Sequence, residues 1–472
     1  MILILFLITL MVSSSINILA YARENKDSIY LDEVVVEAEK IQEEETKDIT
    51  SFVTVIEAEE YTNRVASVSE LLAESVGVNV KRYGGLGSFS TISIRGSSAE
   101  QVAIFLDGVL LNQAKSGIVN LSDIPLDNVE KIEVYRGTSP AKFGGSGIGG
   151  VVNIITKKAK GEVKNDINTS YGSFNTFEAN AFRSQHFEKF NYTFFYNETF
   201  SDGDFKYYDD NGTKYNKEDD KKRRMDNNEF ESRNFLVKLG CDLKQDLNFM
   251  LSNDYFFKDQ GISGIRGLAK EANLETLRNI TQFKIDKSGL FAIPLDGQLS
   301  LFYSYQKQEF EDRKGEVGIG NQDNSNITDA FGGNMLATYY LLDAHILSIY
   351  GGSRREIFDP EEKLVSEDLQ EKQKRTNLTF ALEDEIHLFK DRIVVSPSFK
   401  YDYYKNDFSG QTPYSFATTK GCKKSEGFLT RKMGMYIKLT EWLTLKGNIG
   451  KYYRPPNFSE LFGDRGSIVG NI

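Results

Sequence analysis

The sequence predicts a transmembrane antiparallel β-barrel that is preceded by a compact α+β domain. Three observations support this fold class. First, the 472 residues include 24 Tyr and 33 Phe but only 8 Pro and 1 Trp, a composition that favours many short strands. Second, apolar and polar residues alternate with a period of two in the larger, C-terminal part of the chain. Third, no apolar run after the N-terminal segment approaches the roughly 18 residues of a membrane helix.

The composition also excludes several classes of protein. The formal net charge of −11 argues against a nucleic-acid binder, which would normally carry a basic patch. The two cysteines, Cys241 and Cys422, are far apart, so a small disulfide scaffold and a C-x-x-C metal site are both excluded. None of the 3 His has a ligand-like neighbour at helical spacing, and the sequence indicates no metal site with confidence.

The first 22 residues are typical of a secretory signal peptide. The apolar run Ile2–Val12 is shorter than the about 20 residues that span a bilayer, and Ala20-Tyr21-Ala22 forms an A-x-A cleavage site. The alternative is a short membrane anchor. An exported chain without a helical span is either soluble or inserted as a β-barrel, whose alternating strands escape hydropathy analysis.

Residues 23–47 form a charged extension with one β-prone island, "LDEVVVEAEK" at Leu31–Lys40. Such a segment buries too little surface to fold alone. It is either a leader strand or an extended peptide that adds to the sheet edge of a partner.

Residues 48–158 predict the α+β domain. A strand at "SFVTVIEAEE" precedes a helix in which Ser67 and Glu70 have capping-box spacing. Further strands are expected at Ser90–Gly96 and on both sides of Asp107-Gly108, a strong two-residue hairpin signal. Asp127–Gly137 predicts a turn of helix and another strand.

Three glycines near the end of this domain, Gly145, Gly147 and Gly150, fit the spacing G-x-G-x-x-G. A dinucleotide-binding turn needs a strand before the glycines and a helix after them. Here Pro140 interrupts the preceding segment, and the β-branched run "VVNIIT" that follows predicts a strand. The glycines therefore predict a tight turn that packs closely against a wall, because glycine has no side chain and reaches positive φ.

Residues 159–472 carry the alternating pattern. In "FNYTFFYNETF", Phe190, Tyr192, Phe194 and Tyr196 alternate with polar residues, and "QLSLFYSYQ" and "SPSFKYDYYK" repeat the pattern. One face is too polar for the core of a sandwich, whereas lipid outside and water or polar protein inside explain both faces. The alternative is a water-soluble β-solenoid or propeller, but no fixed-period repeat is visible. Tight turns such as "DLKQD" alternate with long charged loops such as residues 201–232, as in outer-membrane barrels.

Several segments resemble the plug domain of TonB-dependent outer-membrane receptors, most of all the subgroup of cobalamin and catecholate-siderophore receptors. They are "IRG" at Ile94–Gly96, "FLDGVLLN" at Phe105–Asn112, "VEKIEVYRG" at Val129–Gly137 and "FGGSGIGGVVNIITKK". The segment Asp32–Ala38, "DEVVVEA", resembles the TonB box, with Glu37 where Thr is commoner. Tyr452–Asn471 is similar to a stretch in the barrel of these receptors.

The resemblance implies a barrel of about 22 strands with a folded plug inside its lumen, in the outer membrane of a Gram-negative bacterium. It divides the chain into a signal peptide (1–22), a periplasmic extension with the TonB box (23–47), a plug domain (48–158) and a partial β-barrel (159–472). The last segment supplies roughly 12–16 strands, and the chain stops at Gly470-Asn471-Ile472 without the terminal aromatic of the family. We therefore expect a C-terminally truncated fragment.

The function implied by the resemblance is TonB-dependent active import of a scarce, large nutrient, either a ferric siderophore or cobalamin. The small number of histidines argues slightly against haem as the substrate. The partners are TonB, the small-molecule substrate and outer-membrane lipid. The alternatives are a non-energised receptor or adhesin, or a passive plugged channel. No Ser/His/Asp or paired-carboxylate arrangement indicates an enzyme.

The TonB-binding residues implied are Asp32, Glu33, Val34, Val35, Val36, Glu37 and Ala38.

Substrate is expected to meet two outward plug loops, unless these are ordinary surface turns. The predicted contacts are Tyr83, Gly84, Leu86, Ser88, Ser90, Asn112, Gln113 and Lys115. Arg95 and Arg136 are expected to anchor the plug to acids on the inner barrel wall or, alternatively, to bond only within the plug. An acid cluster offers oxygen ligands for a loop Ca²⁺ ion, although a solvated charged loop is the simpler interpretation. That cluster is Asp209, Asp210, Glu218, Asp219 and Asp220.

Overall fold

The computed structural model describes residues 50–462 apart from 62–66, 138–139, 145–146, 214, 245, 265–266, 318–319, 342–343, 365–371 and 409–421. The chain divides into two units, residues 1–46 and residues 47–472. The predicted signal peptide (residues 1–22) and the TonB-box-like segment Asp32–Ala38 lie outside the described residues. All that follows concerns the second unit.

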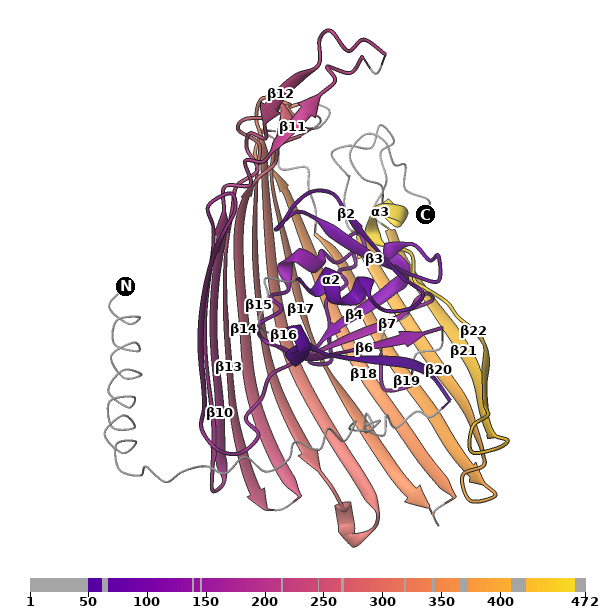
Figure 1. Ribbon diagram of the computed structural model, residues 1–472. Coiled ribbons are helices and arrows are strands. Elements are labelled where there is room, and N and C mark those ends of the chain that lie inside the picture. The colour runs from indigo at the N-terminus through magenta and orange to yellow at the C-terminus, as the bar shows by residue number, and fades with distance from the viewer. Residues whose placement is uncertain are drawn as a thin grey trace, which may run out of the picture. The chain divides into compact units, whose positions relative to one another are not determined.

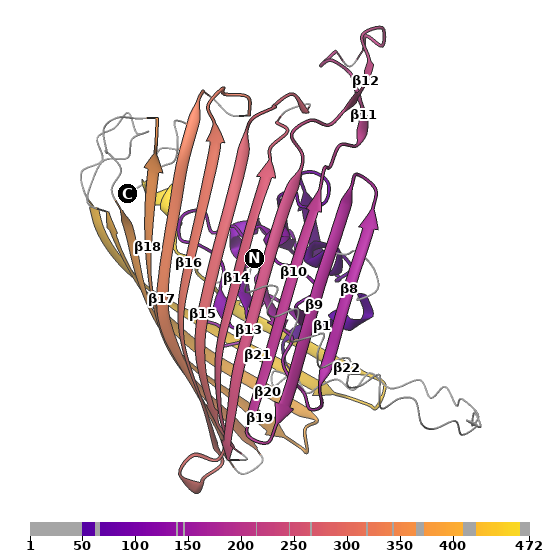
Figure 2. The same cartoon turned by 90° about the vertical axis from the view of Figure 1, so that its left-hand side faces the viewer.

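A broad antiparallel sheet of 13 strands makes up most of this unit, and a smaller domain lies on its concave side (Figures 1 and 2). The small domain is the plug. Its elements are β1 (Phe52–Glu57), η1 (Ala58–Tyr61), α2 (Val68–Ala73), β2 (Val78–Arg82), β3 (Ser90–Ile94), η2 (Ala99–Gln101), β4 (Val102–Leu106), β5 (Val109–Leu110), η3 (Leu121–Asp123), β6 (Val129–Arg136) and β7 (Gly150–Thr156).

The plug is built on a five-stranded sheet with the order β1-β6-β7-β4-β5, in which only β4 and β7 are parallel. The strands β2 and β3 form a separate antiparallel pair. Apolar residues of α2, including Leu71 and Leu72, pack with Ile104, Val134 and Val152 of the sheet in one buried cluster. The helix and the sheet therefore share one core, as the α+β pattern predicts.

Most of the expected local structure of the plug is present. Asp107 and Gly108 have φ values of 50° and 86°, as a type I′ hairpin turn requires. The Ser67 side chain accepts a hydrogen bond from the Glu70 amide at 3.3 Å, but the Glu70 carboxylate pairs with Arg82 at 3.2 Å, so only half of the capping box forms. The helical turn expected after Asp127 was wrong: a simple turn leads directly into β6.

The large sheet consists of long strands that each pair antiparallel with their neighbours in the chain. Its strands are β8 (Lys164–Gly172), β9 (Thr176–Phe187), β10 (Phe190–Ser201), β13 (Phe230–Lys244), β14 (Leu247–Gly261), β15 (Asn273–Lys287), β16 (Leu295–Asp312), β17 (Gln322–Leu341), β18 (His345–Glu362), β19 (Gln373–Leu388), β20 (Ile393–Phe408), β21 (Cys422–Lys438) and β22 (Thr444–Lys451). The edge strands β8 and β22 do not pair with each other within the described residues, so the sheet is not closed.

The two faces of the strands differ as the alternation predicts. On β20, Phe399 and Tyr401 are about half exposed on the convex face, at 51% and 47%, whereas Ser398 and Asp402 are buried beside them. On β10, Phe190 is exposed and Thr193 is buried. The exposed aromatic positions therefore face outward and most polar positions face the plug, which suits lipid outside and polar protein inside, although Phe195 of β10 is buried on the inward face beside Thr193.

Connections at the two rims differ in length. Two-residue turns join β9 to β10 and β13 to β14 at one rim. At the other rim, residues 202–229 join β10 to β13 and carry the projecting hairpin β11 (Lys206–Asp209) and β12 (Lys221–Arg224), as Figure 1 shows. The remaining elements are η5 (Leu290–Ala292) and α3 (Phe458–Phe462). Within the described residues, no helix has the length and apolar character to cross a membrane.

The described glycines of the G-x-G-x-x-G run pack tightly, and strand β7 follows them rather than a helix. Gly150 has a φ of 147°, and a Cβ at this position would clash with the Tyr135 carbonyl. Gly144, just before the run, lies against the Tyr350 hydroxyl of β18. This strand belongs to the 13-stranded sheet, which we call the wall. The predicted close packing is therefore confirmed for Gly147 and Gly150, but these two glycines pack against the plug itself, and Gly145 lies outside the described residues.

The Asp107 hairpin turn anchors the plug to the wall. Its carboxylate accepts hydrogen bonds from the Thr156 amide at 2.9 Å and hydroxyl at 2.5 Å, and it lies 3.0 Å from the Lys238 ammonium of β13. The Lys284 ammonium of β15 donates to the Asp107 carbonyl at 2.7 Å. Burial raises the pKa of Asp107, but Lys238, Lys284 and Thr156 outweigh burial and hold this pKa below its ordinary value.

The two arginines that the sequence nominated as anchors are placed differently. The Arg95 guanidinium lies over the ring of Phe52, at 5.4 Å from its centroid. Arg136 lies beside Arg95, and burial, followed by the charge of Arg95, lowers the pKa of Arg136. Neither arginine forms an ion pair with an acid among the described residues. The wall strands β13 and β14 supply lysines to plug aspartates instead.

Asp107→Asn should lower the free energy of unfolding by about 1–3 kcal/mol, because it leaves the Lys238 charge buried without its partner. The side chain of Lys238 is only 8% exposed. The stabilisation is present above the ordinary aspartate pKa of about 3.9 and is lost as the pH falls through the lowered folded pKa. The measurement is denaturant unfolding in detergent between pH 8 and pH 3.

A matched control is Asp246→Asn, because Asp246 forms an exposed pair with Lys287 at 3.7 Å. It should cost less than about 0.5 kcal/mol. Adding Lys238→Met to Asp107→Asn should recover part of the loss. Equal costs for the two aspartates would contradict the anchoring role of Asp107.

Candidate functional site

A cavity of about 650 Å³ lies between the plug and the long-loop rim of the sheet. We call it the outward cavity. The plug contributes the loop 83–89 between β2 and β3, and the wall contributes residues from the long loop 202–229, from β13 to β15 and from two further loops. Its lining is Tyr83, Gly84, Gly85, Leu86, Gly87, Ser88, Phe89, Phe205, Tyr207, Met225, Asn228, Glu229, Phe230, Gln260, Gly261, Ile262, Ser263, Gly264, Gly267, Leu274 and Val317.

Aromatic pairs lie on both sides of the outward cavity. On the plug side, the Tyr83 and Phe89 rings are 5.5 Å apart and both are exposed, at 67% and 41%. The Tyr83 amide donates to the Phe89 carbonyl at 3.0 Å, which closes the loop and holds the rings together. On the wall side, Phe205 and Tyr207 form an edge-to-face pair at 6.5 Å. The cavity therefore offers two apolar faces with polar edges.

Gly87 lets the plug loop approach the wall. Its φ of 78° is a conformation that favours glycine, and a Cβ here would lie 2.6 Å from the ring of Phe230. Its carbonyl accepts hydrogen bonds from the Ser122 hydroxyl at 3.1 Å and from the Lys258 ammonium. The tip of the loop is thus fixed by one side chain of the plug and one of the wall.

Lys258 of β14 supports the floor of the outward cavity. Its side chain is 2% exposed, and its ammonium lies 3.2 Å from the Asp123 carboxylate and 2.9 Å from the Ser122 hydroxyl. Ser90 closes the same loop, because its amide donates to the Asn120 side chain at 2.9 Å. Buried charges are tolerated only when paired and hydrogen-bonded, and Lys258 meets this condition.

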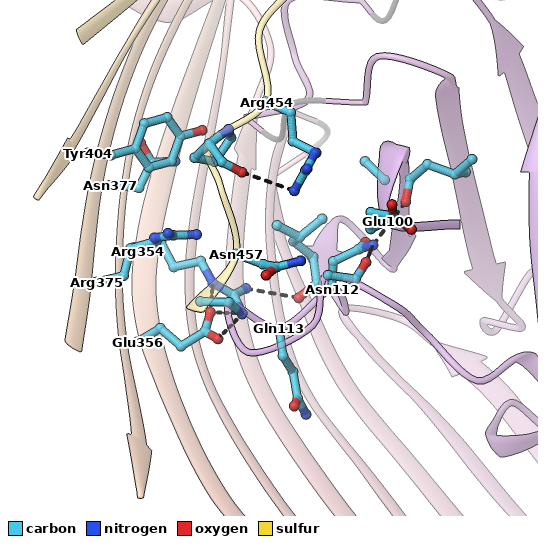
Figure 3. Close-up of a pocket in the computed structure, with 16 residues that line it drawn as sticks. Glu100, Asn112, Gln113, Arg354, Glu356, Arg375, Asn377, Tyr404, Arg454 and Asn457 are labelled. Atoms are coloured by element: carbon cyan, nitrogen blue, oxygen red, sulfur yellow. Dashed lines mark hydrogen bonds and ion pairs between the residues drawn. The ribbon is translucent and has the colours of Figure 1, made fainter. Parts of the chain in front are cut away.

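A second, smaller cavity of about 100 Å³ lies between the plug loop 110–117 and the wall strands β18 to β20 (Figure 3). We call it the inner cavity. Asn112 shapes the plug loop here: its amide donates to the Val102 and Gly117 carbonyls at 2.9 and 2.7 Å, and its oxygen accepts from the Ile104 amide at 2.7 Å. All of these contacts lie within the plug, so Asn112 determines the shape of the loop.

The wall holds this loop through a charged pair. Arg354 and Glu356 of β18 lie 3.0 Å apart, as Figure 3 shows. The Arg354 guanidinium donates to the Leu110 carbonyl at 2.9 Å, and the Glu356 carboxylate accepts from the Ala114 amide. One ion pair therefore provides both a donor and an acceptor to the plug backbone.

The segment after β22 holds the loop from the other side. The Phe458 amide donates to the Ala114 carbonyl at 2.7 Å, and the Asn457 side chain donates to the Ser116 carbonyl at 3.1 Å. Asn457 and Glu460 exchange two hydrogen bonds of 2.7 Å at the start of α3, in the manner of a capping box. Residues 457–460 are thus ordered locally and presented to the plug.

The structure separates the residues that the sequence nominated for substrate. Tyr83, Gly84, Leu86 and Ser88 line the outward cavity, and Ser90 is buried beneath it. The remaining three lie around the loop of the inner cavity: Asn112 and Gln113 line it, whereas the Lys115 ammonium lies 5.2 Å from the ring centroid of Phe358.

Sequence reasoning missed the wall residues of both cavities. Phe205 and Tyr207 start the long loop with a period-two aromatic pattern, which was an available signal. Arg354 and Glu356 are two residues apart and lie on the polar face of one strand, and this spacing of opposite charges was a second available signal. The curvature of the sheet determines which strands face the same plug loop. No local pattern in the sequence predicts this curvature.

The acid cluster of the long loop is spread over the projecting hairpin. Asp209 pairs with Arg223 at 3.0 Å across β11 and β12, and Asp219 accepts from the Thr213 hydroxyl at 2.7 Å. In the part of the chain that the structure describes, no three His, Cys, Asp or Glu residues are grouped so as to hold a metal ion.

Gly87→Ala should destabilise the plug loop by about 1–3 kcal/mol, because the new side chain meets the Phe230 ring at an unfavourable φ. The matched control is Gly85→Ala in the same loop, where a Cβ meets nothing within 4 Å. Thermal unfolding and limited proteolysis of loop 83–89 provide the readouts. Equal behaviour of the two variants would contradict the contact with Phe230.

Comparison with family models covers both parts of the unit. Residues 45–151 match the model described as TonB-dependent Receptor Plug Domain. Residues 162–472 match the model described as TonB dependent receptor-like, beta-barrel.

Among curated proteins, the chain is similar to the vitamin B12 transporter BtuB of Vibrio vulnificus (strain YJ016), with 37% identity over 142 residues. It is 30% identical over 140 residues to BtuB of Vibrio cholerae serotype O1 (strain M66-2). Each alignment covers 30% of this chain and 23% of the relative, so the chain matches less than a quarter of the length of these relatives.

Solved structures share the fold. The copper transporter OprC has a TM-score of 0.72 at 16% identity, and the alignment covers 87% of this chain and 66% of that chain. The siderophore receptor PirA from Acinetobacter baumannii has a TM-score of 0.67 at 18% identity, covering 88% and 63%. The barrel match over most of the chain, the plug match before it and these folds identify the protein as a member of the TonB-dependent receptor family, located in the outer membrane of a Gram-negative bacterium.

Proposed function

We propose that the protein imports a scarce, large nutrient, a ferric siderophore or cobalamin, across the outer membrane with energy supplied through TonB. The observation that carries this proposal is the outward cavity, whose floor is a plug loop and whose walls are barrel loops. A ligand in this cavity would contact the plug directly. Movement of the plug would therefore both sense the ligand and open its path.

The plug is held in a way that is compatible with release. Its contacts with the wall include Asp107–Lys238, Asp123–Lys258 and the Asn128–Asn234 hydrogen bond of 2.8 Å. Water can replace each partner in such polar contacts, so a typical hydrogen bond contributes a net stability of only about 0.5–1.5 kcal/mol. An apolar interface of the same size would resist hydration. We infer that pulling exchanges these contacts for water one after another.

Energy for the release must come from another membrane, because the outer membrane holds no ATP and little potential. We propose that Asp32–Ala38 pairs with TonB as an added strand. In this mode of recognition, main-chain hydrogen bonds provide the affinity. The partner is inferred from family membership and from the sequence of this segment.

A non-energised receptor or adhesin, or a passive channel, remains the rival proposal. The two differ in their response to collapse of the inner-membrane potential, which should stop energised uptake and leave passive entry unchanged. We assign no catalytic role, since the family to which the chain belongs consists of receptors and transporters.

Val35→Pro should abolish energised uptake and leave surface binding intact, because proline removes a backbone donor and fixes φ. Val35→Ala is the control and should take up ligand normally, since it preserves the backbone. Uptake of radiolabelled cobalamin or ⁵⁵Fe-siderophore by cells that depend on this protein is the measurement. Normal uptake by the proline variant would refute pairing at this segment.

Tyr83→Ala and Phe205→Ala should each weaken ligand binding by about tenfold, because each removes one aromatic face of the outward cavity. Tyr215→Ala is the control, since Tyr215 is 94% exposed in the same long loop as Phe205 and does not line the cavity. Equilibrium binding to whole cells tests this. Similar losses at all three positions would contradict the site.

A further inference from the structure

We propose that a proton shared by Asp127 and Glu178 attaches the plug to strand β9 of the wall, so that this contact loosens as the pH rises. The attachment is separate from the proposed import function, because it concerns how the plug is held and involves no ligand. Two acidic side chains from distant parts of the chain form it, and the fold brings them together across the plug–wall interface.

Asp127 and Glu178 approach each other from the plug and from the wall. Asp127 lies in the turn before β6, and the side chain of the next residue, Asn128, donates to Asn234 of β13 at 2.8 Å. Glu178 is near the start of β9, four residues before Phe182, which is buried on the inward face. Period-two alternation therefore places Glu178 on the inward face as well.

A single amide group binds both acids. Asn197 of β10 is 3% exposed, and its side-chain nitrogen donates to Asp127 at 3.2 Å and to Glu178 at 3.4 Å. Its side-chain oxygen accepts from the Thr199 hydroxyl at 3.3 Å, which orients the nitrogen toward the two acids. Glu178 is also hydrogen-bonded to Asp127 itself and to Ser170 of β8.

A hydrogen bond between two carboxyl groups requires a proton. An ionised carboxylate has acceptors only, so two ionised carboxylates at this separation would repel each other. One proton converts the repulsion into a hydrogen bond, in which the carboxylic acid donates and the carboxylate accepts. The contact between Asp127 and Glu178 therefore holds one shared proton.

The surrounding charges favour Glu178 as the donor of this hydrogen bond. Lys157, in the segment after β7, interacts electrostatically with Asp127 and so favours the ionised form of that aspartate. The other charged groups on this side of the plug interact with Lys157 or with each other. They are Glu59 of η1 and Lys164 and Asp166 of β8, which interact with Lys157, and the pair of Lys160 and Glu130 at 2.6 Å.

The pair lies near the rim that carries the long loop. Strands β8, β9 and β10 are neighbours at this edge of the wall, as Figure 2 shows. The turn between β8 and β9 contacts the long loop, because the Asp202 amide donates to the Phe174 carbonyl at 2.9 Å. Glu178 follows four residues after Phe174, and both Glu178 and Asp127 are half-buried. Their proton can therefore exchange with the medium at this rim.

The pH dependence of this contact is opposite to that of the ion pairs described above. Asp107–Lys238 and Asp123–Lys258 need ionised aspartates, so acid weakens them. The contact at β9 binds a proton when it is closed and releases this proton when the two acids separate. Its closed form is therefore favoured as the pH falls and disfavoured as the pH rises.

The first measurement is infrared difference spectroscopy of the purified chain in detergent near neutral pH. We expect the carbonyl stretch of a protonated carboxyl group, and we expect it to disappear in Glu178→Gln and in Asp127→Asn, because each variant leaves one carboxyl group that ionises. Glu198→Gln is the matched control. Glu198 lies on the neighbouring strand and pairs with Arg233 at 2.9 Å, so its replacement should leave this signal unchanged.

The second measurement is hydrogen exchange at the amides of Val129 and Lys157, which both donate at 2.8 Å to carbonyls of the turn that carries Asp127. After correction for the intrinsic pH dependence of exchange, opening should increase at least about tenfold between about pH 6 and about pH 9. Glu178→Gln retains a neutral donor and should abolish this increase. Asp107→Asn should retain the increase, because it removes a different anchor.

Three results would each overturn the shared proton. The first is an infrared signal that is absent, or that is unchanged in both Glu178→Gln and Asp127→Asn. The second is opening that does not change with pH in the unmodified chain. The third is a pH response that persists in Glu178→Gln, since another group would then control the opening. Energised import is tested separately, by uptake after collapse of the inner-membrane potential.

Discussion

The structure depends on ion pairs buried between the plug and the wall. Lys258 and Asp123 are the clearest case, because both side chains are almost fully buried and lie on different parts of the fold. Removing one partner of such a pair leaves an uncompensated charge, which is strongly destabilising. The pair therefore positions the plug accurately, and through the Gly87 carbonyl it positions the floor of the outward cavity too.

The same polar character explains how a folded domain can lie inside a membrane sheet without becoming a permanent part of it. Around the plug, the sheet presents many serines, threonines, asparagines and lysines together with apolar residues such as Ile280 and Phe358 that pack against the plug, whereas its convex face presents aromatic and aliphatic residues. Lipid requires the second surface. The proposed movement of the plug requires the first, because hydrogen bonds to a wall can be exchanged for hydrogen bonds to water at small net cost.

The two cavities between the plug and the wall differ in the chemistry of their lining residues. The outward cavity combines aromatic faces with few charges, whereas the inner cavity is built around guanidinium groups that hold the plug backbone. Arg375 illustrates the second role: its guanidinium lies 4.9 Å from the ring centroid of Phe458 and donates to the Pro456 carbonyl at 2.5 Å. The two cavities are therefore lined by different kinds of side chain.

Local patterns in the sequence were sufficient for the architecture. Period-two alternation with aromatic residues predicts the wall strands, because side chains alternate between lipid and lumen along each strand. Asp107-Gly108 predicts its hairpin, because the turn needs positive φ at both residues. The plug loop 83–89, which the sequence nominated for substrate contact, lines the outward cavity, and its contact with substrate stays a prediction.

Tertiary structure alone decided which residues meet. Arg95 and Arg136 were credible anchors by residue type, yet the backbone turn after β3 places Arg95 over Phe52 and beside Arg136 rather than against a wall acid. The sequence did not identify Lys238 and Lys258 as anchors. The alternating pattern places a lysine on the inward face of a strand, but it does not distinguish a lysine that faces water from one that faces a carboxylate of the plug. The sequence by itself determined the strands, their two faces and the plug. The curvature of the sheet and the depth of the plug decided the contacts, because both depend on packing between segments more than 100 residues apart.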